Sequence, residues 1–407
     1  MREHDDNGGL VNPCHFYKYP IEQIAVLCYN HEMETGINWN TLDGPKLQDA
    51  LQQYCTAQGI SDIHVSPEKG NVRLEVRLHG VLVEISRIDH KTYDDFARQI
   101  KFVSKLKLNV TNIPQDGQYT FTAKADATGK GLKIVNVRVA TIPSRFGETY
   151  TLRLLDPERG IAPLEQLGFP KDIEAKLKDI VAMPNGLFLI TGPTGSGKTT
   201  TLYALLNTIV GRQRHIITLE NPVEYELAGV VQSQIDPDHD YTFASGLRSV
   251  LRHDPNVILV GEIRDYETAQ TAIDASLTGH MVLSTLHTNS AVEAIPRLLS
   301  MGVSPYTFAP AIRAVLAQRL VRTLTPACAA KDAKCDPADN ASYGGRMSLP
   351  ELLMISPEIK KLILQNETAD VISTQAKKEG FKTMGDWGKE LIEARKTTLL
   401  EVERVTM

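Results

Sequence analysis

A glycine-rich octapeptide between an apolar run and a helical pattern limits the possible folds of this chain most strongly. Residues 192–199 read GPTGSGKT and fit the pattern G-x-x-x-x-G-K-[ST]. The glycines of this pattern let backbone N–H groups turn inward around phosphate oxygens. The apolar residues 187–191 precede it and the helical pattern TTLYALLNTIV follows it, so a bound phosphate would lie at a helix N-terminus. The motif therefore predicts an α/β fold with a phosphate site.

In such a loop the lysine reaches the β- and γ-phosphates and the last hydroxyl binds magnesium. These roles fall to Lys198 and Thr199, and the expected cofactors are ATP and Mg²⁺. The residues predicted to bind the nucleotide are Gly192, Pro193, Thr194, Gly195, Ser196, Gly197, Lys198, Thr199 and Thr200.

Short apolar runs alternate with helical stretches beyond residue 186, which is typical of a mostly parallel sheet covered by helices. One run ends at Glu220 and is followed by Glu224, and another ends at Glu262. Ligands bind beyond the carboxyl ends of such strands, so these acids can converge on the phosphate loop. A third run is bracketed by His280 and His287, which could contact the terminal phosphate or be ordinary structural histidines.

The 407 residues predict two or three domains. Residues 1–56 form a short N-terminal segment, and residues 57–156, with alternating apolar runs around one helix, predict a small α+β domain. Prolines and glycines in residues 157–170 predict a linker to a larger domain, residues 171–407. From about residue 303 the apolar spacing favours helices, so we expect a helical C-terminal end.

The charge balance is 44 basic against 49 acidic side chains, a net charge of -5, which disfavours a dedicated nucleic-acid binder. No apolar run approaches the roughly 18 residues of a membrane span, and the beginning MREHDDNGG does not resemble a secretory signal. We therefore expect a cytoplasmic protein. Five cysteines without regular spacing predict reduced thiols.

Four motifs in order resemble those of the motor ATPases of type II secretion and type IV pilus assembly. GPTGSGKTTTLYALL resembles the Walker A motif of this family, ITLENPVEY its Asp box, residues 251–280 its Walker B segment and residues 280–298 its His box. SDIHVSP and VRLEVRLHGVL resemble the start of the family's PAS-like domain, and VRVATIPSRFGETYTLRLL the stretch that supplies its arginines. The resemblance covers roughly residues 57–407.

The resemblance implies a RecA-like P-loop ATPase domain paired with the small domain in a hexameric ring. It gives Glu262 the Walker B role of holding magnesium with Thr199, and gives Glu220 or Glu224 the role of positioning water. The two histidines would link the phosphate to conformation, and three arginines would be finger or sensor residues, with Arg145 ranked last. The catalytic candidates are Glu262, Glu224, Glu220, Arg138, Arg153, Arg145, His280 and His287.

The chain departs from the family pattern in three places. Asn221 stands where an aspartate is usual, so activity would depend more on Glu224 and Glu262. Thr325 stands at the first cysteine position of the family's zinc module, of which Cys328 and Cys335 remain. Because zinc prefers four nitrogen or sulfur ligands, we predict no zinc and no metal other than magnesium. The region before residue 57 is also shorter than in typical members.

These features predict a cytoplasmic homo-hexameric ATPase, associated peripherally with the inner membrane through a platform protein. It would power assembly, that is extension, of a type IV pilus or a type II secretion pseudopilus, because residues 381–405 resemble the end of assembly motors more than of retraction motors. The alternatives are a retraction motor, a nucleic-acid translocase or helicase, and a nucleotide-responsive scaffold without turnover, which Asn221 suggests. We expect no nucleic-acid partner.

Overall fold

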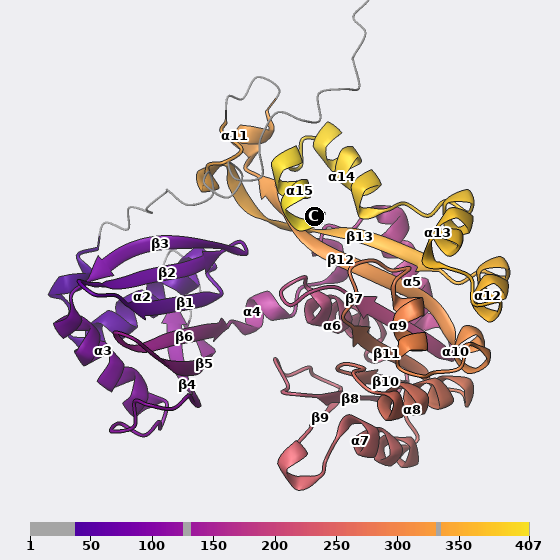
Figure 1. Ribbon diagram of the computed structural model, residues 1–407, viewed down its shortest axis with the longest axis horizontal. Helices are drawn as coiled ribbons and strands as arrows, with labels where there is room; N and C mark the ends of the chain where they lie inside the picture. Colours follow the sequence, from indigo (N-terminus) through magenta and orange to yellow (C-terminus); the bar gives the residue numbers. More distant parts are fainter. Residues whose placement is uncertain (1–36, 125–131, 331–334, 407) are drawn as a thin grey trace, which may run out of the picture.

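The computed structural model describes residues 37–124, 132–330 and 335–406, and it arranges them around two sheets (Figure 1). Figure 1 shows the sheet of the N-terminal part in indigo and purple, with helix α4 (Pro157–Gly160) between it and the larger part. Of the five cysteines predicted to be reduced, Cys14 and Cys28 lie outside the described residues.

The first sheet is antiparallel throughout, in the order β3-β2-β1-β6-β5-β4. Its strands alternate between buried and exposed residues, as in β5, where Val135, Val137 and Val139 enter the core. This small α+β layer matches the pattern expected of residues 57–156. The strands are β1 (Asp62–Pro67), β2 (Val72–Leu78), β3 (Val81–Ile88), β4 (Gln115–Lys124), β5 (Leu132–Ser144) and β6 (Gly147–Leu155).

Two helices cover the apolar face of this sheet, α2 (Gly44–Gln58) and α3 (His90–Val103), with a short turn η1 (Trp39–Thr41) before them. Helix α2 begins where Asp43 accepts a hydrogen bond from the Lys46 amide, and it ends at Gly59 in a left-handed conformation. Its residues Leu47 and Leu51 are buried in the core of the small domain. The helix therefore packs with the small domain, although it falls in the predicted segment 1–56.

The second sheet has the order β13-β12-β7-β11-β10-β8-β9 within the described residues. Its strands from β12 to β9 are parallel, and only β13 runs antiparallel. The apolar runs expected to form strands before residue 290 do so. The strands are β7 (Gly186–Thr191), β8 (Ile216–Glu220), β9 (Val231–Gln234), β10 (Val257–Val260), β11 (Met281–Leu286), β12 (Ile312–Leu324) and β13 (Tyr343–Met354).

Helices enclose this sheet, and α8 packs on β7 and β11 while α14 packs on β13 and α15 on β12. The α-helices are α5 (Lys171–Ala182), α6 (Lys198–Ile209), α7 (Phe243–Val250), α8 (Tyr266–Leu277), α9 (Ala294–Ser300), α10 (Pro305–Ala311), α11 (Pro326–Ala329), α12 (Pro357–Leu364), α13 (Ala369–Lys378), α14 (Met384–Glu393) and α15 (Leu399–Thr406). Short 3-10 turns are η2 (Leu164–Gln166), η3 (Pro237–His239), η4 (Leu251–His253) and η5 (Asn340–Ser342).

The prediction of a helical end from residue 303 is wrong for two long stretches, which are the strands β12 and β13. The apolar run 314–317 is buried on both faces because β12 lies between β7 and β13. A continuous apolar run of this kind cannot be distinguished from a buried helix by periodicity alone. Helices α10 and α12 to α15 agree with the prediction.

The prediction of reduced cysteines is wrong for Cys328 and Cys335, which form a disulfide. Their Cα atoms lie 5.5 Å apart, a separation that a disulfide spans. Cys328 lies on α11, which follows β12, and Cys335 precedes β13. Cys55 is a free thiol buried in the small domain.

Within residues 37–124, 132–330 and 335–406, none of the helices combines the length and the apolar character of a membrane span.

A buried ion pair in the small domain gives a first test of this fold. The Lys101 Nζ atom lies 2.6 Å from Glu148 Oε2, with both side chains at most 6% exposed. Lys101→Ala would leave the Glu148 carboxylate buried without its cation, so the free energy of unfolding should fall by about 3–5 kcal/mol. In a Trp387→Phe background Trp39 is the only tryptophan and reports this domain's urea transition by fluorescence.

The control for this test is Lys46→Ala, which removes an exposed ion pair with Asp43 and should leave the urea transition unchanged. Equal midpoints for the Lys101 and Lys46 variants would contradict a stabilising role of the buried pair.

Candidate functional site

The loop between β7 and α6 is open to an anion because glycines shape its backbone. Gly192 and Gly197 have φ values of 146° and 89°, where other residues are strained. A Cβ atom on Gly192 would lie 2.6 Å from the backbone carbonyl oxygen of Gln318, and one on Gly197 would lie 2.8 Å from the side-chain amide nitrogen of Gln318. The loop therefore packs against β12 at a distance that only glycine permits, with its amides at the start of α6.

Two side chains of the loop, Lys198 and Ser196, are placed to contact a bound ligand. Lys198 starts α6 and donates hydrogen bonds to the carbonyls of Gly192 (2.8 Å) and Pro193 (3.0 Å). Burial lowers the pKa of its ammonium to about 8, although the Glu262 carboxylate opposes this shift. The Ser196 hydroxyl is buried and has no hydrogen-bond partner among the described residues. A buried hydroxyl without a partner beside a desolvated ammonium fits a site that phosphate oxygens complete.

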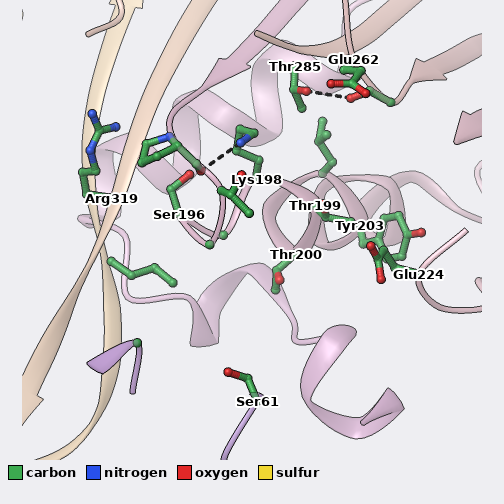
Figure 2. A pocket seen from close by; sticks show the side chains of 18 of the residues that line it. Ser61, Ser196, Lys198, Thr199, Thr200, Tyr203, Glu224, Glu262, Thr285 and Arg319 are labelled. Carbon is green, nitrogen blue, oxygen red and sulfur yellow. Dashed lines mark hydrogen bonds between the residues drawn. The ribbon is translucent and has the colours of Figure 1, made fainter. Parts of the chain in front are cut away.

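The loop opens into a cavity of about 890 Å³ between the two domains, a size typical of ligand sites (Figure 2). Figure 2 shows Lys198, Thr199 and Thr200 at its centre, with Ser61 of the small domain facing them across the cavity. Predicted residues that line it are Pro193, Thr194, Gly195, Ser196, Gly197, Lys198, Thr199, Thr200, Glu220, Glu224, Glu262, His287 and Arg153.

The two acids of the β8 region differ in their surroundings. Glu220 is buried, and it accepts hydrogen bonds from the hydroxyls of Tyr203 and Thr218 and from the Gln232 amide. Glu224 has a side chain that is 29% exposed and pairs with a guanidinium of the small domain. Of the two carboxylates, Glu224 therefore has the greater freedom to meet a ligand or water.

The carboxyl ends of β10 and β11 bring a third acid, Glu262, to the cavity. Glu262 follows β10, and its carboxylate lies 2.7 Å from Arg264 and 3.5 Å from His287 Nε2. The neighbouring Thr285 hydroxyl donates to the Gly261 carbonyl, which fixes the turn that carries Glu262. Glu262 and His287 thus meet at the sheet edge that the sequence indicated.

Of the four predicted residues that do not line the cavity, Gly192 and Arg138 lie beside its lining residues, whereas His280 and Arg145 lie away from it. His280 precedes β11, at the end of this six-residue strand opposite His287, and its Nδ1 atom lies 2.9 Å from the Ala275 carbonyl oxygen. Arg145 lies in the turn between β5 and β6 and stacks on Phe146. Neither side chain lines the cavity beside the loop.

The other two arginines lie opposite each other on β5 and β6. Arg138 pairs with Glu224 at 3.2 Å, across the gap between the domains, and also donates to the Val223 carbonyl. Arg153 donates its Nε–H to Asp62 Oδ1 at 2.8 Å and lines the cavity. Both arginines are therefore paired with carboxylates next to the phosphate loop.

Asp62 was not predicted as a site residue, although it belongs to the motif SDIHVSP. Its side chain is buried, which would raise its pKa, but hydrogen bonds from Arg153 and Ser61 outweigh burial and lower the pKa. Other cavity residues that sequence reasoning missed are Arg77, Tyr203, Arg319, Arg346 and Arg404. Arg319 was missed because it lies on β12, which was expected to be helical, and Arg346 because it lies in the part of β13 that was expected to be a loop.

Among the described residues, no group of three or more His, Cys, Asp or Glu side chains is arranged to hold a metal ion. The expectation of no zinc stays a prediction. For magnesium, the hydroxyl of Thr199 and the carboxylate of Glu262 supply oxygen donors of the kind that this ion prefers.

A family model described as "Type II/IV secretion system protein" matches residues 44–404. The chain belongs to this family. The assignment from four motifs to the nucleotide-binding ATPases of secretion systems is thereby confirmed.

Curated relatives agree with this membership. The chain is 38% identical to the type II secretion system protein HxcR of Pseudomonas aeruginosa, over 90% of this chain and 79% of the relative. It is 40% identical to the type II secretion system protein E of Dickeya dadantii, and 37% identical to the type II secretion system ATPase E of Vibrio cholerae. Each of these two matches covers 89% of this chain and 75% of the relative.

Solved structures share the fold. The pilus retraction motor PilT with bound ADP matches with a TM-score of 0.61 and 26% identity, over 92% of this chain and 97% of that chain. The Legionella pneumophila ATPase DotB matches with a TM-score of 0.68 and 22% identity, over 93% of this chain and 98% of that chain. The type II/IV secretion fold therefore extends over both domains of the chain.

The lowered pKa of Lys198 predicts a pH dependence of nucleotide binding. The ammonium is charged below a pKa of about 8, and phosphate oxygens favour the charged form, so binding of ADP should weaken as the pH rises above 8. The loss should reach up to about tenfold per pH unit in dissociation constants measured by calorimetry from pH 7 to 9.5. Lys198→Arg keeps its charge over this range and should give a flat profile, whereas a flat wild-type profile would contradict the assignment.

Proposed function

We propose that this chain is an ATP hydrolase that powers a type II secretion or type IV pilus machine. The observation that carries the proposal is the cavity between the domains, where Lys198 of the phosphate loop, Glu262 and Arg153 meet. Family membership supports the same activity, since a relative with 37% identity is named a type II secretion system ATPase.

Binding would begin at the loop amides and Lys198. The Lys198 ammonium would leave the carbonyls of Gly192 and Pro193 for the β- and γ-phosphate oxygens, which are stronger acceptors. The Ser196 hydroxyl would gain a partner in the same step. The helix dipole of α6 adds a favourable field for the anion.

Thr199 and Glu262 would hold magnesium, which neutralises charge on the phosphates when bound. Glu262 is suited to this position because Thr285 fixes its turn and Arg264 and His287 orient its carboxylate. His280 is not included in this proposal, because it lies at the far end of β11.

Glu224 is the acid that we propose to orient the attacking water. Glu220 is saturated by three donors, so it would fix the strand end and Tyr203. Arg138 would leave Glu224 as the nucleotide enters and would join Arg153 at the charge that spreads over the transferring phosphoryl group. The carboxylate of Glu224 would then be available to accept a hydrogen bond from water.

The wider assembly follows from the family resemblance. We propose a RecA-like ATPase domain in residues 171–407, a PAS-like domain in residues 57–156 with α2 added to it, and a linker in residues 157–170. Six copies would form a ring that is cytoplasmic and bound to the inner membrane through a platform protein. The type II secretion names of the relatives at 37–40% identity favour extension of a pseudopilus or pilus. Retraction is the second candidate, supported by the likeness to the retraction motor PilT.

Lys198→Ala tests the reaction itself. The variant should lose phosphate release from ATP to background, because the loop then lacks the cation that reaches the β- and γ-phosphates. Its circular dichroism should match that of the wild type, since Lys198 makes no core contact. Lys176→Ala, on helix α5 away from the cavity, is the matched control. Full turnover by the Lys198 variant would refute the site, and a wild type that binds ATP without releasing phosphate would support the scaffold.

A pair of arginine variants tests the role of the small domain. Arg153→Ala should lower the turnover number by about 10³-fold, the lower end of what a finger arginine contributes. Arg145→Ala should leave turnover unchanged, because its side chain lies in the β5–β6 turn outside the cavity. The measurement is steady-state phosphate release at saturating ATP. Equal rates for the two variants would show that the small domain supplies no catalytic group at position 153.

A further inference from the structure

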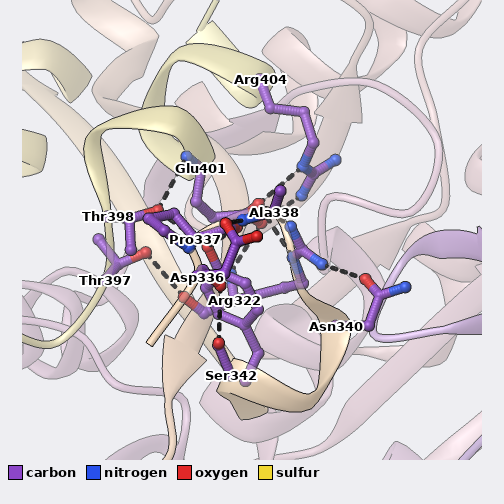
Figure 3. A network of polar contacts seen from close by, with 11 residues as sticks. Arg322, Asp336, Pro337, Ala338, Asn340, Ser342, Thr397, Thr398, Glu401 and Arg404 are labelled. Carbon is purple, nitrogen blue, oxygen red and sulfur yellow. Dashed lines mark hydrogen bonds and ion pairs between the residues drawn. The ribbon is translucent and has the colours of Figure 1, made fainter. Parts of the chain in front are cut away.

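The last helix of the described chain is fastened to the large sheet by a buried network of charged groups (Figure 3). Glu401 on α15 is fully buried. Its carboxylate accepts hydrogen bonds from the backbone N–H and the side chain of Arg322 on β12, at 2.9 Å each. These contacts attach helix α15 to β12, the strand that packs against the phosphate loop.

The guanidinium of Arg322 is engaged by contacts within the protein and is not available to bind a ligand. Its guanidinium lies 4.0 Å from the centre of the Tyr343 ring and donates to the Asn340 side chain at 2.6 Å. The Thr397 hydroxyl donates to the Arg322 carbonyl. Arg322 is thus a structural cation whose contacts hold α15 in place.

Arg404, one turn further along α15, differs from Arg322. It donates to both oxygens of Glu401, at 2.9 Å from Nε and 2.5 Å from Nη2, and its side chain is 32% exposed. It also lines the cavity of the phosphate loop, together with Val405, Leu320 and Arg346. One guanidinium therefore connects the buried carboxylate with the nucleotide cavity.

The charge of the network favours an anion on the cavity side. Burial alone would raise the pKa of Glu401, but hydrogen bonds from Arg404 and Arg322 outweigh it and lower the pKa, so the carboxylate is ionised. Two guanidiniums and one carboxylate leave one net positive charge among the three side chains. The acids Glu220, Glu224 and Glu262 line the same cavity, and Arg319, Arg346 and Arg404 from β12, β13 and α15 add cations to it.

We propose that Arg404 is a nucleotide-binding residue and that α15 forms one wall of the nucleotide site. Glu401 fixes the guanidinium against β12, and the ligand is an anionic nucleotide held by the phosphate loop. Occupancy of the site then tightens the attachment of α15, so the C-terminal helix responds to the bound nucleotide. This inference rests on the proposed nucleotide-binding function.

The test is the affinity of the full chain for MgADP, measured by calorimetry. Arg404→Gln should raise the dissociation constant about tenfold, as expected for loss of one hydrogen bond to a charged group. Arg404→Lys keeps the charge but not the planar guanidinium, so its dissociation constant should lie between those of the wild type and Arg404→Gln. Arg395→Gln is the matched control, because Arg395 donates to the Ala330 carbonyl and does not line the cavity. Its affinity should equal that of the wild type.

A second measurement needs no variant. In the wild type, MgADP should slow hydrogen exchange of the α15 amides, residues 399–406, beyond its effect on α13. Affinity of Arg404→Gln within twofold of the wild type, or α15 exchange unaffected by MgADP, would overturn the inference while the phosphate-loop site stands. Failure of the wild type to bind MgADP, with no difference from Lys198→Ala, would instead refute the proposed function.

Discussion

The phosphate loop must present its amides to an anion while it packs tightly against the next strand, and the rest of the site depends on this constraint. Gly192 and Gly197 meet it, because a Cβ on either would collide with Gln318 of β12. Gln318 also accepts a hydrogen bond from the Thr201 hydroxyl, so β12 holds both the loop and the first turn of α6. Displacement of β12 would therefore disturb Lys198 and the cavity wall together.

The small domain contributes two charged side chains to the site. Arg138 and Arg153 extend from adjacent strands, and each meets a carboxylate, Glu224 or Asp62, in the described state. Opposite charges in a partly desolvated cavity interact more strongly than on the surface. In the proposed cycle, binding of a nucleotide would exchange these ion pairs for contacts with phosphate, and the separation of the two domains would change with that exchange.

The sequence allowed the phosphate loop, the strand-end acids and two of the three arginines to be placed, because each depends on a local motif or on strand ends at one sheet edge. It did not allow β12 and β13 to be recognised; in β12, residues 314–317 are all apolar and buried, so they show no alternation that would identify a strand. Partners distant in the chain were also missed, such as Asp62 for Arg153 and Glu401 for Arg322, which are 91 and 79 residues apart. The disulfide between Cys328 and Cys335 was missed as well, because nothing in the spacing of the cysteines indicated it.

The proposed catalytic ATP site lies in the cavity between the domains and is built on the phosphate loop. A crystal structure of the chain with Mg²⁺ and a non-hydrolysable ATP analogue is its decisive test. The triphosphate should lie in the loop 192–199, with the Lys198 ammonium moved from its two carbonyls to the phosphates and Arg153 within hydrogen-bond distance of the γ-phosphate. A triphosphate bound elsewhere, with Lys198 still on the carbonyls of Gly192 and Pro193, would contradict it.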